Sequence, residues 1–271
     1  MQMIRTIRTV FCLASLLLAW AEPSSAQELA PLAVEVADVP TREGVFERLL
    51  IVTPPTPRAI AVLLSGGNGG LALTPEGGFG RGGANFLVRS RSRFAREGLL
   101  TVVVDAPSDR QGGAFFDGFR RTPEHAADLK AVMAWLRGRY ALPIWLVGTS
   151  RGTLSAAFVA VELSQAGGPD GLVLTSSLLN DRREGSVTSL DLARLRIPVL
   201  VVHHHDDGCF VCSYSDVPHL MAMLQATTRA ELMTMEGGQT RGNPCEAWAY
   251  HGYNGIEDQV VRQIAQWVLA P

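Results

Sequence analysis

A serine stands at the centre of a Gly-x-Ser-x-Gly motif at residues 148–152, which read G-T-S-R-G. A serine hydroxyl is a weak nucleophile, so it must be exposed, next to a base and beside donors for an oxyanion. A sharp turn from a strand into a helix presents it in this way. The apolar run 144–147 precedes the motif and a helix-compatible stretch, 153–163, follows it. The pattern predicts Ser150 as the nucleophile and the amide of Arg151 as one oxyanion donor.

An acid is expected in the loop after a later buried strand. Where such a turn carries the nucleophile, the acid and then the histidine follow the serine along the chain. The apolar run 198–202 leads into three histidines and then Asp206 and Asp207. The acid must hold the imidazole in the correct tautomer. We favour Asp207, because a few residues beyond the strand the loop can turn toward the site, and Asp206 is the alternative.

The base is expected after the last strand and before the final helix. His251 lies in the segment 249–253, A-Y-H-G-Y, just ahead of the helix-compatible stretch 257–269. It is the only histidine beyond His219, so it is predicted to shuttle the proton of Ser150. His125 precedes Ser150 at a helix start. We expect it on the surface of that helix or supporting the site residues from behind, and a place at the border of the pocket is the alternative.

A glycine-rich segment at 65–70, S-G-G-N-G-G, follows an apolar run and is the candidate for the second oxyanion donor. Glycines let the backbone approach an anion closely. We favour the amide of Gly67, with Asn68 next. The segment lacks the motifs of phosphate-binding loops, so a nucleotide cofactor is not predicted.

A metal site is suggested by the three histidines at 203–205 and by the Cys209-x-x-Cys212 pair that follows them. Adjacent side chains on a strand point to opposite faces, so at most two of the histidines, His203 and His205, lie on the same face. A structural zinc site needs four close ligands. We therefore predict no metal and no other cofactor.

A disulfide between Cys209 and Cys245 would join the loop of Asp207 to that of His251 and stabilise the fold by roughly 4 kcal/mol. Cys212–Cys245 is the alternative pairing. Since the chain has three cysteines beyond Cys12, an odd number, at least one thiol is free or pairs between molecules.

Along the chain, apolar runs alternate with helix-compatible stretches. Runs that are apolar on both faces are typical of the centre of a parallel sheet covered by helices. The pattern predicts an α/β fold with an open, mostly parallel sheet of about eight strands and helices on both faces. The expected strands are 32–36, 45–53, 59–64, 99–104, 144–147, 172–175, 198–202 and 231–235, and the expected helices are 86–96, 123–140, 153–163, 217–226 and 257–269.

The first 26 residues have the pattern of an export signal. Arg5 and Arg8 precede the apolar run 10–20, and small residues at 24–26 allow cleavage before Gln27. The apolar run is too short for a membrane span. We therefore predict one domain at 27–271, periplasmic or secreted, with no stable membrane span. The net charge of −2 on the 271 residues argues against nucleic-acid binding.

Several segments together resemble the α/β hydrolase superfamily, and small exported bacterial members most closely. The resemblance covers roughly residues 44 to 269. The matching segments are NFLVRSR at 85–91, DAPSDR at 105–110, EHAADL at 124–129, VGTSRG at 147–152, VHHHDDGC at 202–209, PCE at 244–246 and HGYNGIE at 251–257. The resemblance implies Ser150, Asp207 and His251 as the triad. Ser65-Gly66 stands where many members have His-Gly.

Members of this superfamily often insert a lid between the strands predicted at 172–175 and 198–202. The interval is too short here for a large lid, so an open site is expected. We accordingly expect a serine hydrolase that cleaves small carboxylic esters through an acyl-enzyme. The alternatives are a thioesterase, amidase or acyltransferase of the same fold, or a non-catalytic exported protein that binds a ligand.

Overall fold

The computed structural model describes residues 31–270, so the predicted export signal at 1–26 lies outside the described residues. Eight strands form one sheet in the order β1-β2-β4-β3-β5-β6-β7-β8. The pairs β1–β2 and β2–β4 are antiparallel, and every other pair is parallel. The strands are β1 (Ala33–Arg42), β2 (Val45–Thr53), β3 (Ala59–Leu64), β4 (Leu99–Val104), β5 (Ile144–Thr149), β6 (Gly171–Thr175), β7 (Val199–His204) and β8 (Ala230–Met235).

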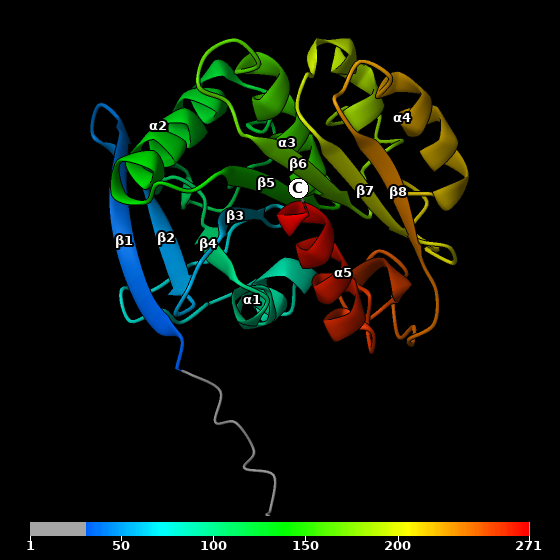
Figure 1. The fold of residues 1–271 in the computed structure, drawn as a ribbon, viewed down its shortest axis with the longest axis horizontal. Coiled ribbons are helices and arrows are strands. Elements are labelled where there is room, and N and C mark those ends of the chain that lie inside the picture. Colours follow the sequence, from blue (N-terminus) through cyan, green and yellow to red (C-terminus); the bar gives the residue numbers. More distant parts are fainter. Residues whose placement is uncertain (1–30, 271) are drawn as a thin grey trace, which may run out of the picture.

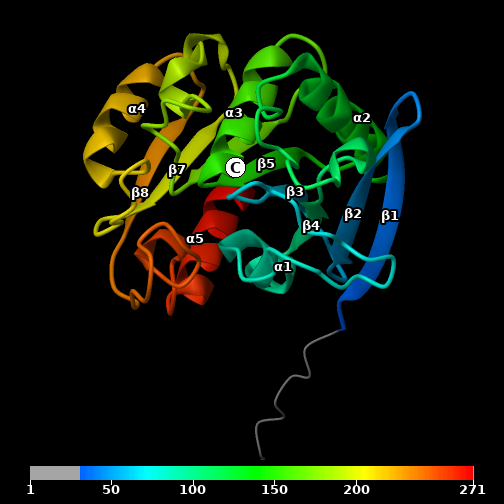
Figure 2. The same cartoon turned by 180° about the vertical axis from the view of Figure 1, so that it is seen from behind.

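Helices cover both faces of the sheet (Figures 1 and 2). On one face lie α2, α3 and α4, and on the other lie α1 and α5. The helices are α1 (Phe86–Arg96), α2 (Pro123–Arg139), α3 (Arg151–Glu162), α4 (Val217–Met223) and α5 (Glu257–Leu269). The predicted α/β architecture is therefore confirmed.

The central strands are apolar on both faces because they contribute to two cores. In β3, Ile60 and Val62 pack in the core beneath α2, α3 and α4, whereas Ala59 and Ala61 pack in the core beneath α1 and α5. This follows from the two-residue period of a strand. Burial of every residue of β3 holds its C-terminal end, where the glycine-rich segment begins, firmly in the sheet.

Element bounds differ from the sequence prediction mainly at the sheet edge and around the motifs. The first strand extends to Arg42 because it pairs with β2 from Ala33 to Arg42, with one register shift between Pro40 and Arg42. Strand β5 extends to Thr149 because that residue pairs with Thr175. The strand β7 runs to His204 because it continues to pair with β8. At α2, Thr122 accepts a hydrogen bond from the amide of His125 and Pro123 starts the helix, as helix-start patterns predict.

Between β6 and β7 the chain forms only two short turns, Val187–Ser189 and Leu192–Arg194. This connection holds no large lid, which confirms the expectation. Among the described residues no helix has the length and apolar character that a membrane crossing requires.

Candidate active site

Ser150 lies at the turn between β5 and α3 in a strained backbone conformation. Its φ is 54° and its ψ is −128°, a region that residues with a side chain rarely occupy. The flanking glycines are required by close packing. A Cβ on Gly148 would lie 2.5 Å from the carbonyl oxygen of Gly152, and one on Gly152 would collide with the carbonyl of Leu64. The turn thus presses α3 against the end of β3 and presents Ser150 to a cavity.

Asp207 and His251 form a hydrogen-bonded pair. Nδ1 of His251 lies 2.8 Å from Oδ2 of Asp207, and both side chains are buried. The other carboxylate oxygen of Asp207 accepts from the amide of Cys209. Burial opposes ionisation of this carboxyl, but the hydrogen bonds from His203 and His251 outweigh it and lower the pKa of Asp207 to about 2. The carboxylate is therefore charged at neutral pH and fixes the histidine ring.

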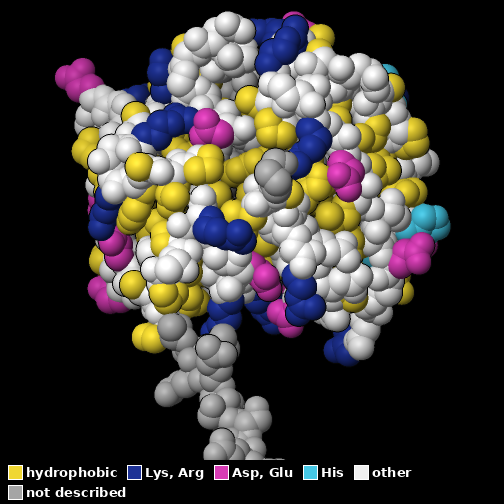
Figure 3. Space-filling view, in the orientation of Figure 1, with side chains coloured by type: hydrophobic (Ala, Val, Ile, Leu, Met, Phe, Trp, Pro, Cys, Tyr) yellow, Lys and Arg dark blue, Asp and Glu magenta, His cyan; other side chains and the backbone are white. Residues whose placement is uncertain are grey.

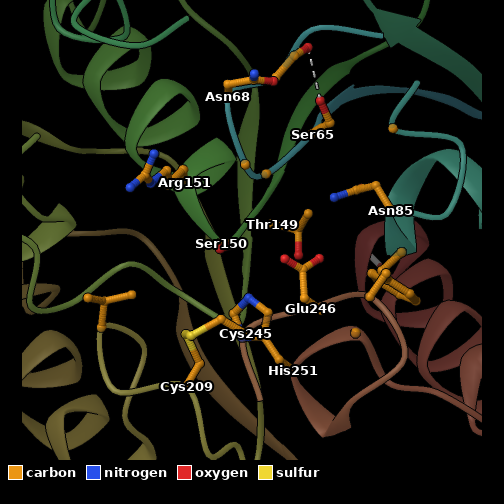
Figure 4. A pocket seen from close by; sticks show the side chains of 18 of the residues that line it. Ser65, Asn68, Asn85, Thr149, Ser150, Arg151, Cys209, Cys245, Glu246 and His251 are labelled. Atoms are coloured by element: carbon orange, nitrogen blue, oxygen red, sulfur yellow. Dashed lines mark hydrogen bonds between the residues drawn. A yellow bond between two sulfur atoms is a disulfide. The ribbon is translucent and has the colours of Figure 1, made fainter. Parts of the chain in front are cut away.

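The second ring nitrogen of His251, Nε2, is not used in the contact with Asp207. Nε2 of His251 has no hydrogen-bond partner within residues 31–270 and is buried. His251 and Ser150 line the same cavity, of about 1100 Å³. Figure 4 shows both residues facing it, one from the β5–α3 turn and the other from the segment before α5. This is the arrangement in which a histidine can exchange a proton with a serine.

Hydrogen bonds and an ion pair hold the segment that carries His251 in place. Oγ of Ser176 donates to the carbonyl of His251, and the hydroxyl of Tyr253 donates to the carbonyl of Val202. Arg89 donates to the carbonyl of Gly252 and pairs with Glu257. These bonds connect the histidine to β6, β7 and α1, so its position is set by the sheet.

The other predicted acid, Asp206, lies elsewhere. Its carboxylate contacts Nδ1 of His205 at 2.8 Å, and both side chains are more than half exposed. The remaining two histidines also have structural partners. Nε2 of His203 lies 2.8 Å from the carbonyl of Cys212, and His204 stacks on Tyr250. The three histidines therefore do not converge.

The glycine-rich segment passes directly beside Ser150. A Cβ on Gly66 would lie 2.9 Å from Cβ of Ser150, whereas one on Gly67 would meet no atom within 4 Å. The amides of Gly67 and Arg151 donate to no other backbone group in the described chain. Oδ1 of Asn68 accepts from the amide of Gly70, so this side chain stabilises the turn itself.

A buried arginine that the sequence analysis did not identify holds this segment from behind. Arg120 is 2% exposed. Its guanidinium donates to the carbonyls of Gly67 and Ser65 at 3.0 and 3.2 Å and to Oγ of Ser155 at 2.8 Å. Burial lowers the pKa of Arg120 to about 10, so it stays charged at neutral pH. It links the glycine-rich segment to α3.

Cys209 and Cys245 form the disulfide that the sequence analysis favoured. It joins the loop of Asp207 to the segment before His251 and lines the cavity (Figure 4). Cys212 is a free, buried thiol, and burial raises its pKa well above the ordinary value. Cys209, Cys212 and His251 are the one group of potential metal ligands found within the described residues. Because Cys209 is in the disulfide, the group does not offer three free ligands.

His125 lies apart from this set. It is fully buried against Phe116 and Phe119, not on the surface of α2. Burial, together with the charge of Arg120, lowers its pKa to about 3, so the ring is neutral.

Comparison with known proteins gives structural neighbours only. No model of a protein family matches the sequence, and no curated protein matches it either. A dienelactone hydrolase from Anabaena variabilis superposes with a TM-score of 0.61 at 16% identity, covering 88% of this chain and 97% of that one. A lidless α/β serine hydrolase from Xanthomonas campestris gives 0.56 at 18%, covering 89% and 96%. A fungal esterase from Rhizomucor miehei gives 0.62 at 14%, covering 91% and 85%.

These neighbours align with this chain over most of their length. Together with the eight-stranded order and the strand-to-helix turn at Ser150, they show that the chain has the α/β hydrolase fold.

Proposed function

We propose that this protein is a serine hydrolase that cleaves carboxylic esters through an acyl-enzyme. The observation that carries the proposal is how the two ring nitrogens of His251 are bonded. Its Nδ1 is held by Asp207 at 2.8 Å, while Nε2 has no partner in the described chain, and His251 lines the same cavity as Ser150. The names of the structural neighbours, hydrolases and esterases, support the same class.

In this proposal Oγ of Ser150 attacks the acyl carbon and Nε2 of His251 takes the hydroxyl proton. The amides of Gly67 and Arg151 donate to the oxyanion of the tetrahedral intermediate. Collapse breaks the ester bond, and the leaving alcohol takes the proton from His251. A water molecule then attacks the acyl-enzyme with His251 again as base, which releases the acid and restores Ser150.

The test is labelling with a fluorophosphonate, which reacts with activated serines. We expect the wild-type protein to be labelled and the Ser150→Ala variant to remain unlabelled. Labelling of both proteins to the same extent would refute Ser150 as the nucleophile. A series of 4-nitrophenyl esters then measures the acyl-chain preference, and an open site predicts hydrolysis of short chains.

We also propose that residues 1–26 are an export signal and that 27–271 form one periplasmic or secreted domain. The disulfide supports this, since such bonds persist in oxidising compartments. Mass spectrometry of protein recovered from the periplasm of an expression host should give an N-terminus at Gln27. Recovery of protein that retains residues 1–26 would contradict cleavage there.

A further inference from the structure

The cavity beside Ser150 collects positive charge in a chain that is slightly acidic overall. The whole sequence has 24 basic and 26 acidic residues, and on the face shown in Figure 3 both kinds are interspersed. The charged side chains that line the cavity are four arginines and two carboxylates besides the histidine, namely Arg81, Arg151, Arg182, Arg183, Asp181 and Glu246. The net charge of the cavity lining is therefore positive, whereas the net charge of the whole chain is negative.

One of these arginines is already neutralised. The guanidinium of Arg151 lies 3.5 Å from Asp117, 3.6 Å from Asp181 and 3.8 Å from Glu184. The carboxylate of Asp181 is further occupied by the amides of Arg183 and Glu184. Asp181 is thus committed to Arg151 and to its own turn.

The other three arginines have unused donors. Within residues 31–270, the side chains of Arg81, Arg182 and Arg183 form no ion pair and no hydrogen bond, and all three are exposed. Arg81 is held over the ring of Phe115, with its guanidinium carbon 4.8 Å from the ring centre. Of the two lining carboxylates, only Glu246 is left without an ion pair in the same range. The cavity therefore has a surplus of unpaired guanidinium groups.

These groups come from two separate segments. Arg81 lies between the glycine-rich segment and α1, whereas Arg182 and Arg183 lie in the connection after β6. Both segments border the cavity that Ser150 lines. A guanidinium presents a planar fork of donors that matches a carboxylate, and hydrogen bonds between charged groups are stronger than neutral ones. An anionic group on a bound ester would meet these donors.

We propose that the cavity selects esters that carry a free carboxylate, bound by Arg81 or by the Arg182–Arg183 pair while Ser150 attacks the ester group. This rests on the proposed esterase function and names the substrate class of the same site. A neutral ester can only accept hydrogen bonds from these cations and has no charge to pair with them, so it gains less than a carboxylate does.

Monomethyl and dimethyl esters of succinic, glutaric and adipic acid test this directly, since each pair differs only in one charged end. The rate of acid release is followed at constant pH, and kcat/KM is compared within each pair. We expect the monomethyl ester to be preferred about tenfold at one chain length or more. The preference should fall as salt is added, because salt screens charge pairs.

Substitution of the arginines shows which of them causes the preference for the monomethyl ester. In Arg81→Gln, or in the double variant Arg182→Gln/Arg183→Gln, the monomethyl-to-dimethyl ratio of kcat/KM should fall at least about fivefold. Arg262→Gln is the matched control, because Arg262 is a largely exposed arginine of α5 that does not line the cavity. That variant should keep the wild-type ratio.

The outcomes separate the two proposals. Hydrolysis of the dimethyl esters with no preference for any monomethyl ester overturns the carboxylate proposal and leaves the esterase in place. An unchanged ratio in both arginine variants also overturns it. Absence of hydrolysis of every ester, together with absence of fluorophosphonate labelling, overturns both.

Discussion

At the scale of single residues, the Asp207–His251 pair makes a prediction about both rate and pH. In Asp207→Asn the amide cannot stabilise a charged imidazole, so we expect kcat/KM for an ester to fall about 10³–10⁴-fold. Because the pKa of Asp207 is lowered from 3.8 to about 2 on folding, its ionisation stabilises the fold above the unfolded value. That contribution is lost as pH falls through about 2.

Urea unfolding of wild type and Asp207→Asn between pH 2 and 6 measures this. The free energy of unfolding of the wild type should drop more steeply toward acid than that of the variant. Parallel curves would contradict the lowered pKa. Asp206→Asn is the matched control, since that carboxylate pairs with His205 at the exposed surface and should leave kcat/KM near the wild-type value.

Arg120 is the second residue whose effect can be isolated. It does not line the cavity itself but donates to the carbonyls of Ser65 and Gly67, which do line it, so it acts as a positioning residue. In Arg120→Gln the segment loses this support, and we expect kcat to fall about 10–100-fold with a small change in KM. Arg120→Lys keeps the charge without the fork and should lie in between.

Arg121→Gln, at the neighbouring exposed position, controls for loss of an arginine. Thermal unfolding of each variant shows whether the protein is still folded. A folded variant with lowered kcat then indicates a misplaced glycine-rich segment and not a misfolded protein. A folded Arg120→Gln variant that retains full kcat would show that the glycine-rich segment holds its own geometry.

At the scale of elements, the disulfide ties the loop after β7 to the segment before α5. Loss of this cross-link should lower the midpoint of thermal unfolding by roughly 5–15 °C. Scans of wild type with and without a phosphine reductant measure the shift. The Cys209→Ala/Cys245→Ala double variant should match the reduced wild type and should not respond to the reductant. A fully reduced wild type that unfolds at the oxidised midpoint would show that the cross-link stabilises nothing.

The contact between α3 and β3 gives a sharper test of packing. In Gly152→Ala the new methyl group would meet the carbonyl of Leu64, so we expect a loss of about 1–3 kcal/mol in the free energy of unfolding. Gly138→Ala in α2 is the matched control, because a Cβ there meets no atom within 4 Å. That change should stabilise the protein by about 0.5–1 kcal/mol, since alanine is the better helix former. Equal effects of the two changes, measured in urea, would exclude the close approach as the cause.

At the scale of the whole molecule, the sequence predicted what depends on local pattern and chain order. The apolar runs predict the central strands, because a short run that is apolar on both faces is typical of a buried parallel strand. The chain order of Ser150, Asp207 and His251 places them at one edge of the sheet. Arg120 escaped prediction because its partners Gly67 and Ser155 are 53 and 35 residues away, and no local pattern marks an arginine for burial. Arg81 and the Arg182–Arg183 pair were not predicted for the same reason, since only the fold brings their segments to one cavity.

Glu47 is the other charge whose environment only the fold reveals, and it sets a pH dependence for the whole molecule. It is fully buried on β2, and neither carboxylate oxygen has a hydrogen-bond partner within the described chain. Burial, and then the nearby charge of Asp128, raises the pKa of Glu47 well above its ordinary value of 4.5. Below that value the residue is protonated in both folded and unfolded chains. Above it only the unfolded chain releases the proton, so the free energy of unfolding falls as pH rises.

Glu47→Gln removes this dependence by supplying a neutral group of the same shape. We expect the variant to unfold with a free energy about 1–3 kcal/mol above that of wild type at pH 8, and with nearly the same free energy at pH 4. Urea unfolding at the two pH values measures both differences. The exposed Glu43→Gln variant should match wild type at each pH. A Glu47→Gln variant less stable than wild type at pH 8 would mean that the carboxylate is ionised and paired in the folded protein, contrary to its burial without a partner.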